Sequence, residues 1–162
     1  MKEYSQEETN QFLQTLPKKY IGAAMILRNS KEEILVVKTN YHGGKWTLPG
    51  GSCEPYEDPQ ETAVRETLEE IGLNIRVGRL LYVDTVVNVR AHTDGLAFHF
   101  DGGHVSEADI EKIVLQDEEI VEYMFVSQDQ DVNIFEQSVL RRFPFIVKAL
   151  KSYYPIFTKS EE

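Results

Sequence analysis

Carboxylate side chains are concentrated in one stretch of the sequence, which runs from Gly50 to Leu73. Carboxylate oxygens are preferred ligands of Mg²⁺, and a carboxylate can also take up or release a proton during catalysis. The stretch contains a single basic residue, Arg65, so its acids must be solvated, paired or bound to a cation. These acids are Glu54, Glu57, Asp58, Glu61, Glu66, Glu69 and Glu70.

The second half of this stretch predicts a helix from about Pro59 to about Ile71. Asp58 is suited to be the N-cap, Glu61 is its capping-box partner, and Pro59 occupies the first helical position, where no N–H is missed. Gly72 is suited to the C-terminal cap. The helix therefore begins and ends at residues whose types favour those positions.

Helical periodicity of about 100° per residue divides this helix into two faces. Glu66, Glu69 and Glu70 share one face, where like charges repel by a few tenths of a kcal/mol per exposed pair. A divalent cation would turn that repulsion into attraction, whereas the alternative is an ordinary solvated acidic face. The other face is predicted to meet the core through Ala63, Val64, Thr67, Leu68 and Ile71.

The spacing around the helix resembles the Nudix box, whose pattern is G-x5-E-x7-R-E-U-x-E-E-x-G-U, with U a bulky apolar residue. Leu48, Pro49 and Gly50 also resemble the usual lead-in to that box. Thr67 stands where the pattern has its first apolar residue, and its methyl group can still pack. The positions that match are Gly51, Glu57, Arg65, Glu66, Glu69, Glu70, Gly72 and Leu73.

The resemblance implies a Nudix-like α/β/α sandwich around a mixed sheet. It also implies hydrolysis of a phosphoanhydride bond in a nucleoside diphosphate linked to another group, with Mg²⁺ or Mn²⁺ as cofactor. Arg65 would orient a box glutamate, and Glu57 would support the loop or the metal shell. The metal would be held by Glu66, Glu69 and Glu70.

Several residues remain open as the general base. Within the box, Glu69 or Glu70 is suited to take a proton from the attacking water. A glutamate outside the box has this role or binds a further metal in some Nudix proteins, and Glu119 and Glu118 are the candidates here.

The class of substrate is chosen mainly by excluding Nudix subfamilies whose sequence marks are absent. No proline lies between Asn74 and Leu96, which argues against an ADP-ribose hydrolase and leaves a nucleoside triphosphate or modified nucleotide, as for MutT-like enzymes. We expect Trp46 and Arg90 to contact the substrate. Gly50 and Gly51 would let backbone approach it closely, because glycine has no Cβ. His92 and His99 could also reach it across their hairpin.

Two other functions stay open. One is a catalytically inactive Nudix-like nucleotide-binding or regulatory module, against which the complete set of box glutamates argues. The other is a structural domain with an acidic helix and no ligand.

Length and composition set the remaining expectations. A chain of 162 residues with 41% hydrophobic residues predicts one globular domain, 1–162. The single cysteine, Cys53, excludes an internal disulfide and favours a reducing, cytoplasmic compartment. A pI near 4.9 argues against nucleic-acid binding, and no apolar run approaches the ~18 residues of a membrane span. We therefore expect a monomer or homodimer that binds a small nucleotide.

The rest of the chain predicts strands around the acidic box, 50–73. An N-terminal extension, 1–17, should carry a short helix that docks through Phe12, Leu13 and Leu16. A C-terminal helix, 136–154, should be kinked or split at Pro144. Between them, Asp94-Gly95 should form a hairpin tip, 101–104 a loop and 106–114 a short helix. The expected strands are 20–27, 33–38, 75–87, 96–100 and 120–126.

Overall fold

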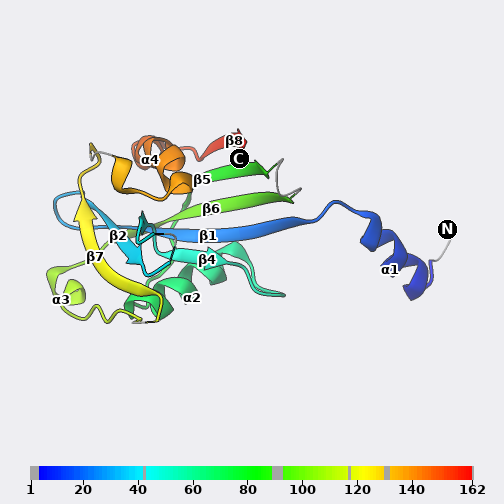
Figure 1. The fold of residues 1–162 in the computed structure, drawn as a ribbon, viewed down its shortest axis with the longest axis horizontal. Coiled ribbons are helices and arrows are strands. Elements are labelled where there is room, and N and C mark those ends of the chain that lie inside the picture. Colours follow the sequence, from blue (N-terminus) through cyan, green and yellow to red (C-terminus); the bar gives the residue numbers. More distant parts are fainter. Residues whose placement is uncertain (1–3, 42, 89–92, 117, 130–131, 162) are drawn as a thin grey trace.

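The described part of the chain folds around one mixed sheet of eight strands, in the main order β3-β2-β1-β6-β5-β8 (Figure 1). The structure is a computed structural model and describes residues 4–41, 43–88, 93–116, 118–129 and 132–161. Beside the main order, β4 pairs with β1 and β7 pairs with β2. The strands are β1 (Lys19–Arg28), β2 (Ile34–Thr39), β3 (Trp46–Thr47), β4 (Gly50–Ser52), β5 (Leu80–Asn88), β6 (Thr93–His104), β7 (Ile120–Val126) and β8 (Ile156–Glu161). The helices are α1 (Gln6–Thr15), α2 (Pro59–Ile71), α3 (Glu107–Ile110) and α4 (Gln137–Leu150), with a 3₁₀ turn, η1 (Val132–Ile134).

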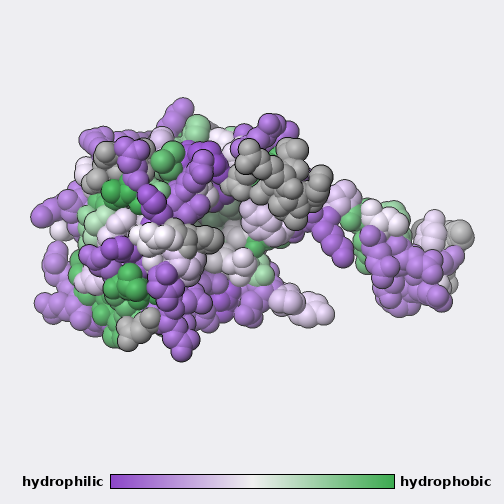
Figure 2. Space-filling view, viewed as in Figure 1, coloured by the Kyte–Doolittle hydropathy of each residue, from purple (hydrophilic) through white to green (hydrophobic). Residues whose placement is uncertain are grey.

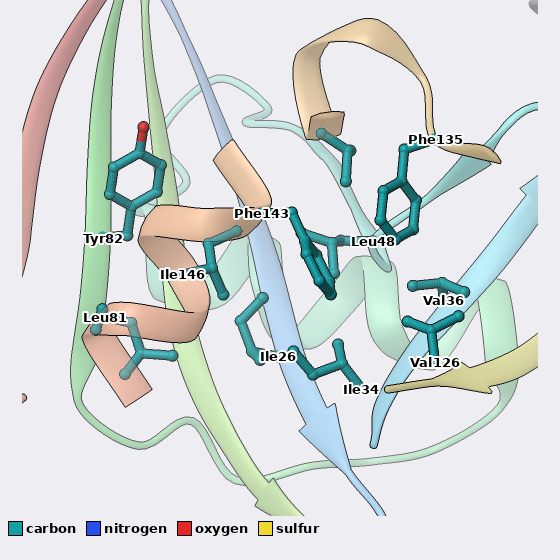
Figure 3. Packing of buried hydrophobic residues seen from close by; sticks show 12 residues of the cluster. Ile26, Ile34, Val36, Leu48, Leu81, Tyr82, Val126, Phe135, Phe143 and Ile146 are labelled. Carbon is teal, nitrogen blue, oxygen red and sulfur yellow. The ribbon is translucent and has the colours of Figure 1, made fainter. Parts of the chain in front are cut away.

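Helices α2 and α4 cover opposite faces of this sheet (Figure 1). Under α4, Phe143 and Ile146 pack against strand residues such as Ile26 (Figure 3). Under α2, Ala63 and Ile71 pack in a second buried cluster. The predicted α/β/α sandwich is therefore confirmed. No helix in the described part of the chain is long and apolar enough to cross a membrane.

Strand β1 lies in the middle of the sheet and contributes side chains to the buried clusters on both of its faces. Ile26 belongs to the cluster under α4, whereas Met25 and Leu27 belong to the cluster under α2. Successive side chains of a strand point to opposite faces, so one apolar run can fill both cores. Each such side chain, once fully buried, stabilises the fold by about 1.5–3 kcal/mol.

The predicted N-terminal helix forms, but its predicted docking on the body is wrong. Ser5 caps α1, and Glu8 completes the capping box. Phe12, Leu13 and Leu16 are exposed, and α1 projects from the body as a mainly hydrophilic arm (Figures 1 and 2). The physical reason is that α1 has too little apolar surface to offset the entropy lost on docking.

Two predicted loops of the central hairpin belong to strand β6 instead. Asn88 pairs with Thr93, so Asp94 and Gly95 lie inside β6 and do not form the predicted tip, while residues 89–92 lie outside the described residues. A Cβ on Gly95 would lie 2.4 Å from Cε1 of Tyr20, so the glycine allows that ring to cover the strand. The segment 101–104 also extends β6, with a register shift opposite β1.

The boundaries of three other elements differ from those expected. Strand β5 begins only at Leu80, and α3 ends at Ile110. Helix α4 ends at Leu150 and is not split by Pro144, whose side chain is exposed. Strand β8, which pairs in parallel with β5, was not predicted, because its six residues alternate too briefly to stand out in the sequence.

Candidate active site

Helix α2 begins and ends as predicted from the sequence. The Asp58 side chain accepts hydrogen bonds from the backbone N–H groups of Gln60 and Glu61, at 2.7 and 3.0 Å. Glu61 returns the capping-box bond to the Asp58 N–H at 3.0 Å. Gly72 closes the helix in the left-handed conformation, with φ 73°. These local bonds fix the direction in which the acidic side chains leave the helix.

The buried face of α2 is rotated relative to the predicted one. Ala63, Thr67 and Ile71 are buried as expected, but Leu68 is 46% exposed, so its assignment to the core was wrong. Thr62 is fully buried, and Glu70 is only 3% exposed. The rotation follows from the close packing of α2 on β4, which buries Glu70 rather than Leu68.

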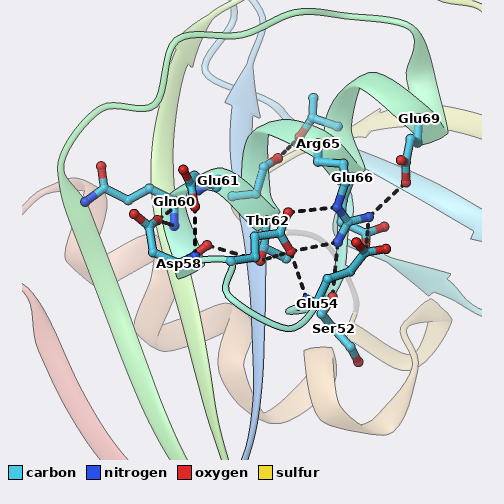
Figure 4. A network of polar contacts seen from close by, with 12 residues as sticks. Ser52, Glu54, Asp58, Gln60, Glu61, Thr62, Arg65, Glu66 and Glu69 are labelled. Carbon is cyan, nitrogen blue, oxygen red and sulfur yellow. Dashed lines mark hydrogen bonds and ion pairs between the residues drawn. The ribbon is translucent and has the colours of Figure 1, made fainter.

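The Arg65 side chain pairs with several acids of the box (Figure 4). Its Nε donates to Glu57 Oε1 at 2.8 Å, and its Nη1 lies 2.9 Å from both Glu66 Oε1 and Glu69 Oε2. Its Nη2 also donates to the Ser52 carbonyl at 3.1 Å. Hydrogen bonding to Arg65 lowers the pKa of Glu57 to about 2. The guanidinium therefore supplies the counter-charge for this side of the cluster.

Glu70 occupies a more enclosed position against β4. Its Oε2 accepts a hydrogen bond from the Gly50 N–H at 2.9 Å. Burial raises the pKa of Glu70 to about 8, against this hydrogen bond, with the charges of Glu66, Glu119 and Glu69 raising it further. Burial also raises the pKa of Glu66. Both carboxyl groups thus lie where a negative charge is costly.

Gly51 makes room for one of these carboxylates. A Cβ at this position would lie 2.3 Å from Glu66 Oε1, closer than non-bonded atoms approach. At Gly50, with φ 150°, a Cβ would lie 2.3 Å from the Ala23 carbonyl oxygen. Neither position can carry a side chain unless its neighbours move, so the glycine pair lets β4 pass between β1 and the acidic face of α2.

Of the two glutamates predicted outside the box, Glu119 lies near the cluster. Its charge raises the pKa of both Glu66 and Glu70. The turn before Glu119 is tied to α2, since the Gln116 N–H donates to the Glu70 carbonyl at 3.1 Å.

Tyr41 also lies within the electrostatic influence of the acidic cluster. Burial raises the pKa of its phenol, and Glu70, Glu119 and Glu66 raise it further. Tyr41 opens the segment 41–46, which the sequence suggested as one of two places where substrate specificity could lie, but it was not named as a site residue.

The chemistry of these side chains fits a hard divalent cation. The donor set is made of carboxylate oxygens that raise one another's pKa. Among the described residues, no three acidic, histidine or cysteine side chains converge as a ready-made metal site. The reason is the pairing of Glu66 and Glu69 with Arg65, which draws both toward its guanidinium.

Only some of the residues predicted to contact the substrate belong to the described part of the chain. Trp46 is half-buried in β3, packs on the core under α4 and has Lys38 Nζ 5.7 Å from its ring centroid. Arg90 and His92 lie outside the described residues. Gly50 and Gly51 line a cavity of about 180 Å³ between the sheet and α4.

Two residues that line this cavity, and the buried partner of one of them, were not suggested as site residues by the sequence. Ser138 and Arg142 line it from α4, and Asp84, which pairs with Arg142, is fully buried in β5. His99, which the sequence suggested could reach substrate, also lines it. A lone buried aspartate in a strand was the only available signal, and its partner 58 positions away could not be inferred.

The chain was compared with known proteins. The family model "NUDIX domain" matches residues 18–143. Diphosphoinositol polyphosphate phosphohydrolase 3-alpha of Mus musculus is 42% identical over 63 residues, which are 38% of this chain and 38% of that relative. The chain thus matches well under half of the length of this curated relative.

Solved structures match over more of the chain. The MutT protein of Methanosarcina mazei Go1 is 25% identical with a TM-score of 0.69, covering 84% of this chain and 98% of that one. An ADP-ribose pyrophosphatase of Streptococcus suis 89-1591 is 17% identical with a TM-score of 0.61, covering 88% of this chain and 100% of that one. The second likeness concerns the fold alone.

Proposed function

The chain belongs to the NUDIX family, and from this membership we propose that it hydrolyses a phosphoanhydride bond in a nucleoside diphosphate linked to another group. The observation that carries the proposal is the enclosed position of Glu70 against β4, where its Oε2 accepts the Gly50 hydrogen bond at 2.9 Å and the charges of Glu66 and Glu119 raise its pKa. The preferred substrate is a nucleoside triphosphate or modified nucleotide, and the likeness to a MutT protein supports this choice.

We further propose that Glu66, Glu69 and Glu70 hold Mg²⁺ or Mn²⁺, with Glu57 supporting the shell. When bound, the cation neutralises the diphosphate oxygens and activates water for attack. Arg65 acts as a positioning residue, because its bonds fix where Glu57, Glu66 and Glu69 lie.

The proton of the attacking water goes to a carboxylate of the cluster. Glu70 is suited to this role because its carboxyl group lies enclosed against β4, next to Glu66 and the Gly50 backbone. Glu119 and Glu69 are the alternative bases. The Gly50 N–H fixes one Glu70 oxygen, which leaves the other either to bind the cation or, if Glu70 is the base, to take the proton.

The partner in this proposal is a small nucleotide, bound by a monomer or homodimer in a cytoplasmic setting. Nucleotide and phosphate release should be measured over a panel of nucleoside triphosphates and nucleoside diphosphate derivatives with Mg²⁺ or Mn²⁺. We expect turnover that EDTA abolishes and that Glu69→Gln reduces by orders of magnitude. Glu54→Gln, the same change at an exposed acid of the box loop, is the matched control. Full turnover in excess EDTA, or none on any nucleotide, would refute the proposal.

A further inference from the structure

The arm formed by α1 carries an apolar stripe that no other segment of the described chain covers. Phe12, Leu13 and Leu16 are 61%, 53% and 43% exposed. Together with Thr9, whose side chain ends in a methyl and a hydroxyl group, they occupy the i, i+3, i+4 and i+7 positions that share one face of a helix. The arm stands apart from α2 and α4 (Figure 1), so the stripe faces solvent along its length.

The connection to the sheet holds the arm away from its own body. Leu16 is extended, with ψ 144°, as is usual before a proline. Pro17 and Lys18 alone separate it from β1, and two residues span about 7 Å at most. Strand β1 is paired with β6 from its first residue, where Lys19 Nζ lies 2.6 Å from Asp94 Oδ2. The described part of the chain therefore cannot reach the stripe, and a cover would have to come from another molecule.

A helix as short as α1 needs such a cover to persist. It has ten residues, and isolated helices shorter than about 12–15 residues are only marginally stable in water. The capping box of Ser5 and Glu8 satisfies N–H groups at its start, but no residue of α1 is buried. Packing of the stripe would supply the stability that the length of the helix does not.

The stripe is symmetric about its own centre. Measured from the midpoint between Phe12 and Leu13, Thr9 and Leu16 lie equally far along the chain on either side. Two arms that run antiparallel would therefore set Phe12 of one copy against Leu13 of the other. The same two-fold axis would set Thr9 of one copy against Leu16 of the other. Such a self-complementary surface is what an isologous dimer requires.

The charges at the two ends of the arm favour the same antiparallel arrangement. Glu7 and Glu8 lie in the first turn of α1, whereas Lys18 and Lys19 follow the stripe. Antiparallel arms bring the acidic end of one copy near the basic end of the other, and parallel arms would bring like charges together. The helix itself contains no lysine or arginine, so an anionic membrane surface would not attract its polar face.

We propose that α1 pairs in an antiparallel manner with α1 of a second copy of this chain, through the stripe of Thr9, Phe12, Leu13 and Leu16. Pairing buries the stripes of two arms at once, so it removes twice the apolar surface that one arm offers. Two ten-residue helices bury less than the roughly 1,200–2,000 Å² of a standard interface, so the dimer is a weak one. It joins the arms alone and does not involve the buried clusters of either body.

The test is sedimentation equilibrium of the full chain between about 5 and 500 µM, a range suited to weak association. We expect the apparent mass to rise reversibly from one copy toward two. Phe12→Ala should raise the dissociation constant by about tenfold or more, because it removes the contact nearest the two-fold axis. Gln11→Ala, the same change on the opposite face of α1, is the matched control and should leave the dissociation constant unchanged. Alanine favours the helix in both variants, and both side chains are exposed, so neither change should disturb the body. A monomer at every concentration, or equal dissociation constants for the wild type and Phe12→Ala, would overturn the proposal.

The direction of the arms is tested by disulfide formation in a Cys53→Ser background. Thr9→Cys protein should cross-link to Leu16→Cys protein, and neither should cross-link to itself, because a disulfide needs the two residues to be opposite each other. Thr9→Cys protein that cross-links to itself would show parallel arms and contradict the proposal. Association of the wild type with Phe12→Ala at full strength would show that an arm meets the body of the second copy, which would also overturn it. These measurements do not involve turnover, so their outcome is independent of the proposed function.

Discussion

Replacing Glu70 by glutamine should stabilise the metal-free protein at alkaline pH while removing its activity. Burial raises the pKa of this carboxyl from 4.5 to about 8 in the folded state. The folded protein therefore holds its proton more tightly than the unfolded chain does. The stability that this provides is fully present below pH 4.5 and is lost as the pH rises through 8. A glutamine side chain at this position never ionises and can still accept the Gly50 hydrogen bond, so the variant does not lose this stability.

The expected change in stability follows from the size of the pKa shift of Glu70. A pKa raised from 4.5 to about 8 corresponds to a ceiling of roughly 5 kcal/mol for full ionisation. Half of this ceiling, roughly 2 to 3 kcal/mol, amounts to a change in Tm of about 5–10 °C for a domain of this length. The Tm of Glu70→Gln should thus equal that of the wild type near pH 5 and exceed it by this amount at pH 9.

Thermal unfolding in EDTA between pH 5 and pH 9 measures this difference directly. Groups that titrate alike in both proteins cancel when the two curves are subtracted. Glu54→Gln makes the same chemical change at an exposed position of the box loop, and its curve should stay parallel to the wild type. Parallel curves for Glu70→Gln as well would show that Glu70 is not held in a costly ionised state, and the reasoning would fail.

Four further predictions concern the rest of the molecule. Turnover should rise from pH 6 toward alkaline pH, because the attacking water and its base must both lose protons; a rate that falls over this range would contradict the mechanism. Gly51→Ala should lower kcat at least tenfold while the protein still unfolds cooperatively, since its Cβ would displace Glu66, 2.3 Å away; wild-type kcat would contradict the contact. Trp46→Ala and Arg90→Ala should raise KM and change the ranking of substrates more than kcat on the best one; equal losses on every substrate would point to a structural role. Removal of residues 1–17 should leave the Tm within about 2 °C, because α1 buries no residue; a larger drop in a melting experiment would show that the arm contacts the body.

Local interactions explain why the acidic helix could be predicted so closely. The caps Asp58 and Gly72 act within a few residues of themselves, so their types alone fix where α2 begins and ends. Which face of α2 is buried depended on the partner strand. Periodicity could not show that β4 would press against Glu70 and leave Leu68 exposed, because that contact joins residues about 20 positions apart.

Glycine positions were the main source of error in the strands. Gly95 and the pair at 102–103 suggested turns, which is the commonest use of this residue. In the structure Gly95 lies under the ring of Tyr20, and a Cβ on Gly102 would lie 2.5 Å from the Leu27 side chain. Both glycines allow close packing across the sheet, and such contacts become visible only once the strand register is known.

The two halves of the candidate site differ in whether their residues are close together in the sequence or far apart. The acids of α2 are neighbours in sequence, so one motif could suggest the chemistry. The cavity joins Tyr20, His99 and Arg142 across β1, β6 and α4, and its charge is set by Asp84 together with β8, the strand that sequence reasoning missed. The buried polar contacts beside the cavity therefore depend on the last strand of the sheet, although the acidic cluster lies on a helix near the middle of the chain. Shortening the side chain of Thr158 or Ser160 should then lower the Tm and leave the acidic cluster of α2 undisturbed, because in the described part of the chain these hydroxyls contact Asp84 and no carboxylate of the box.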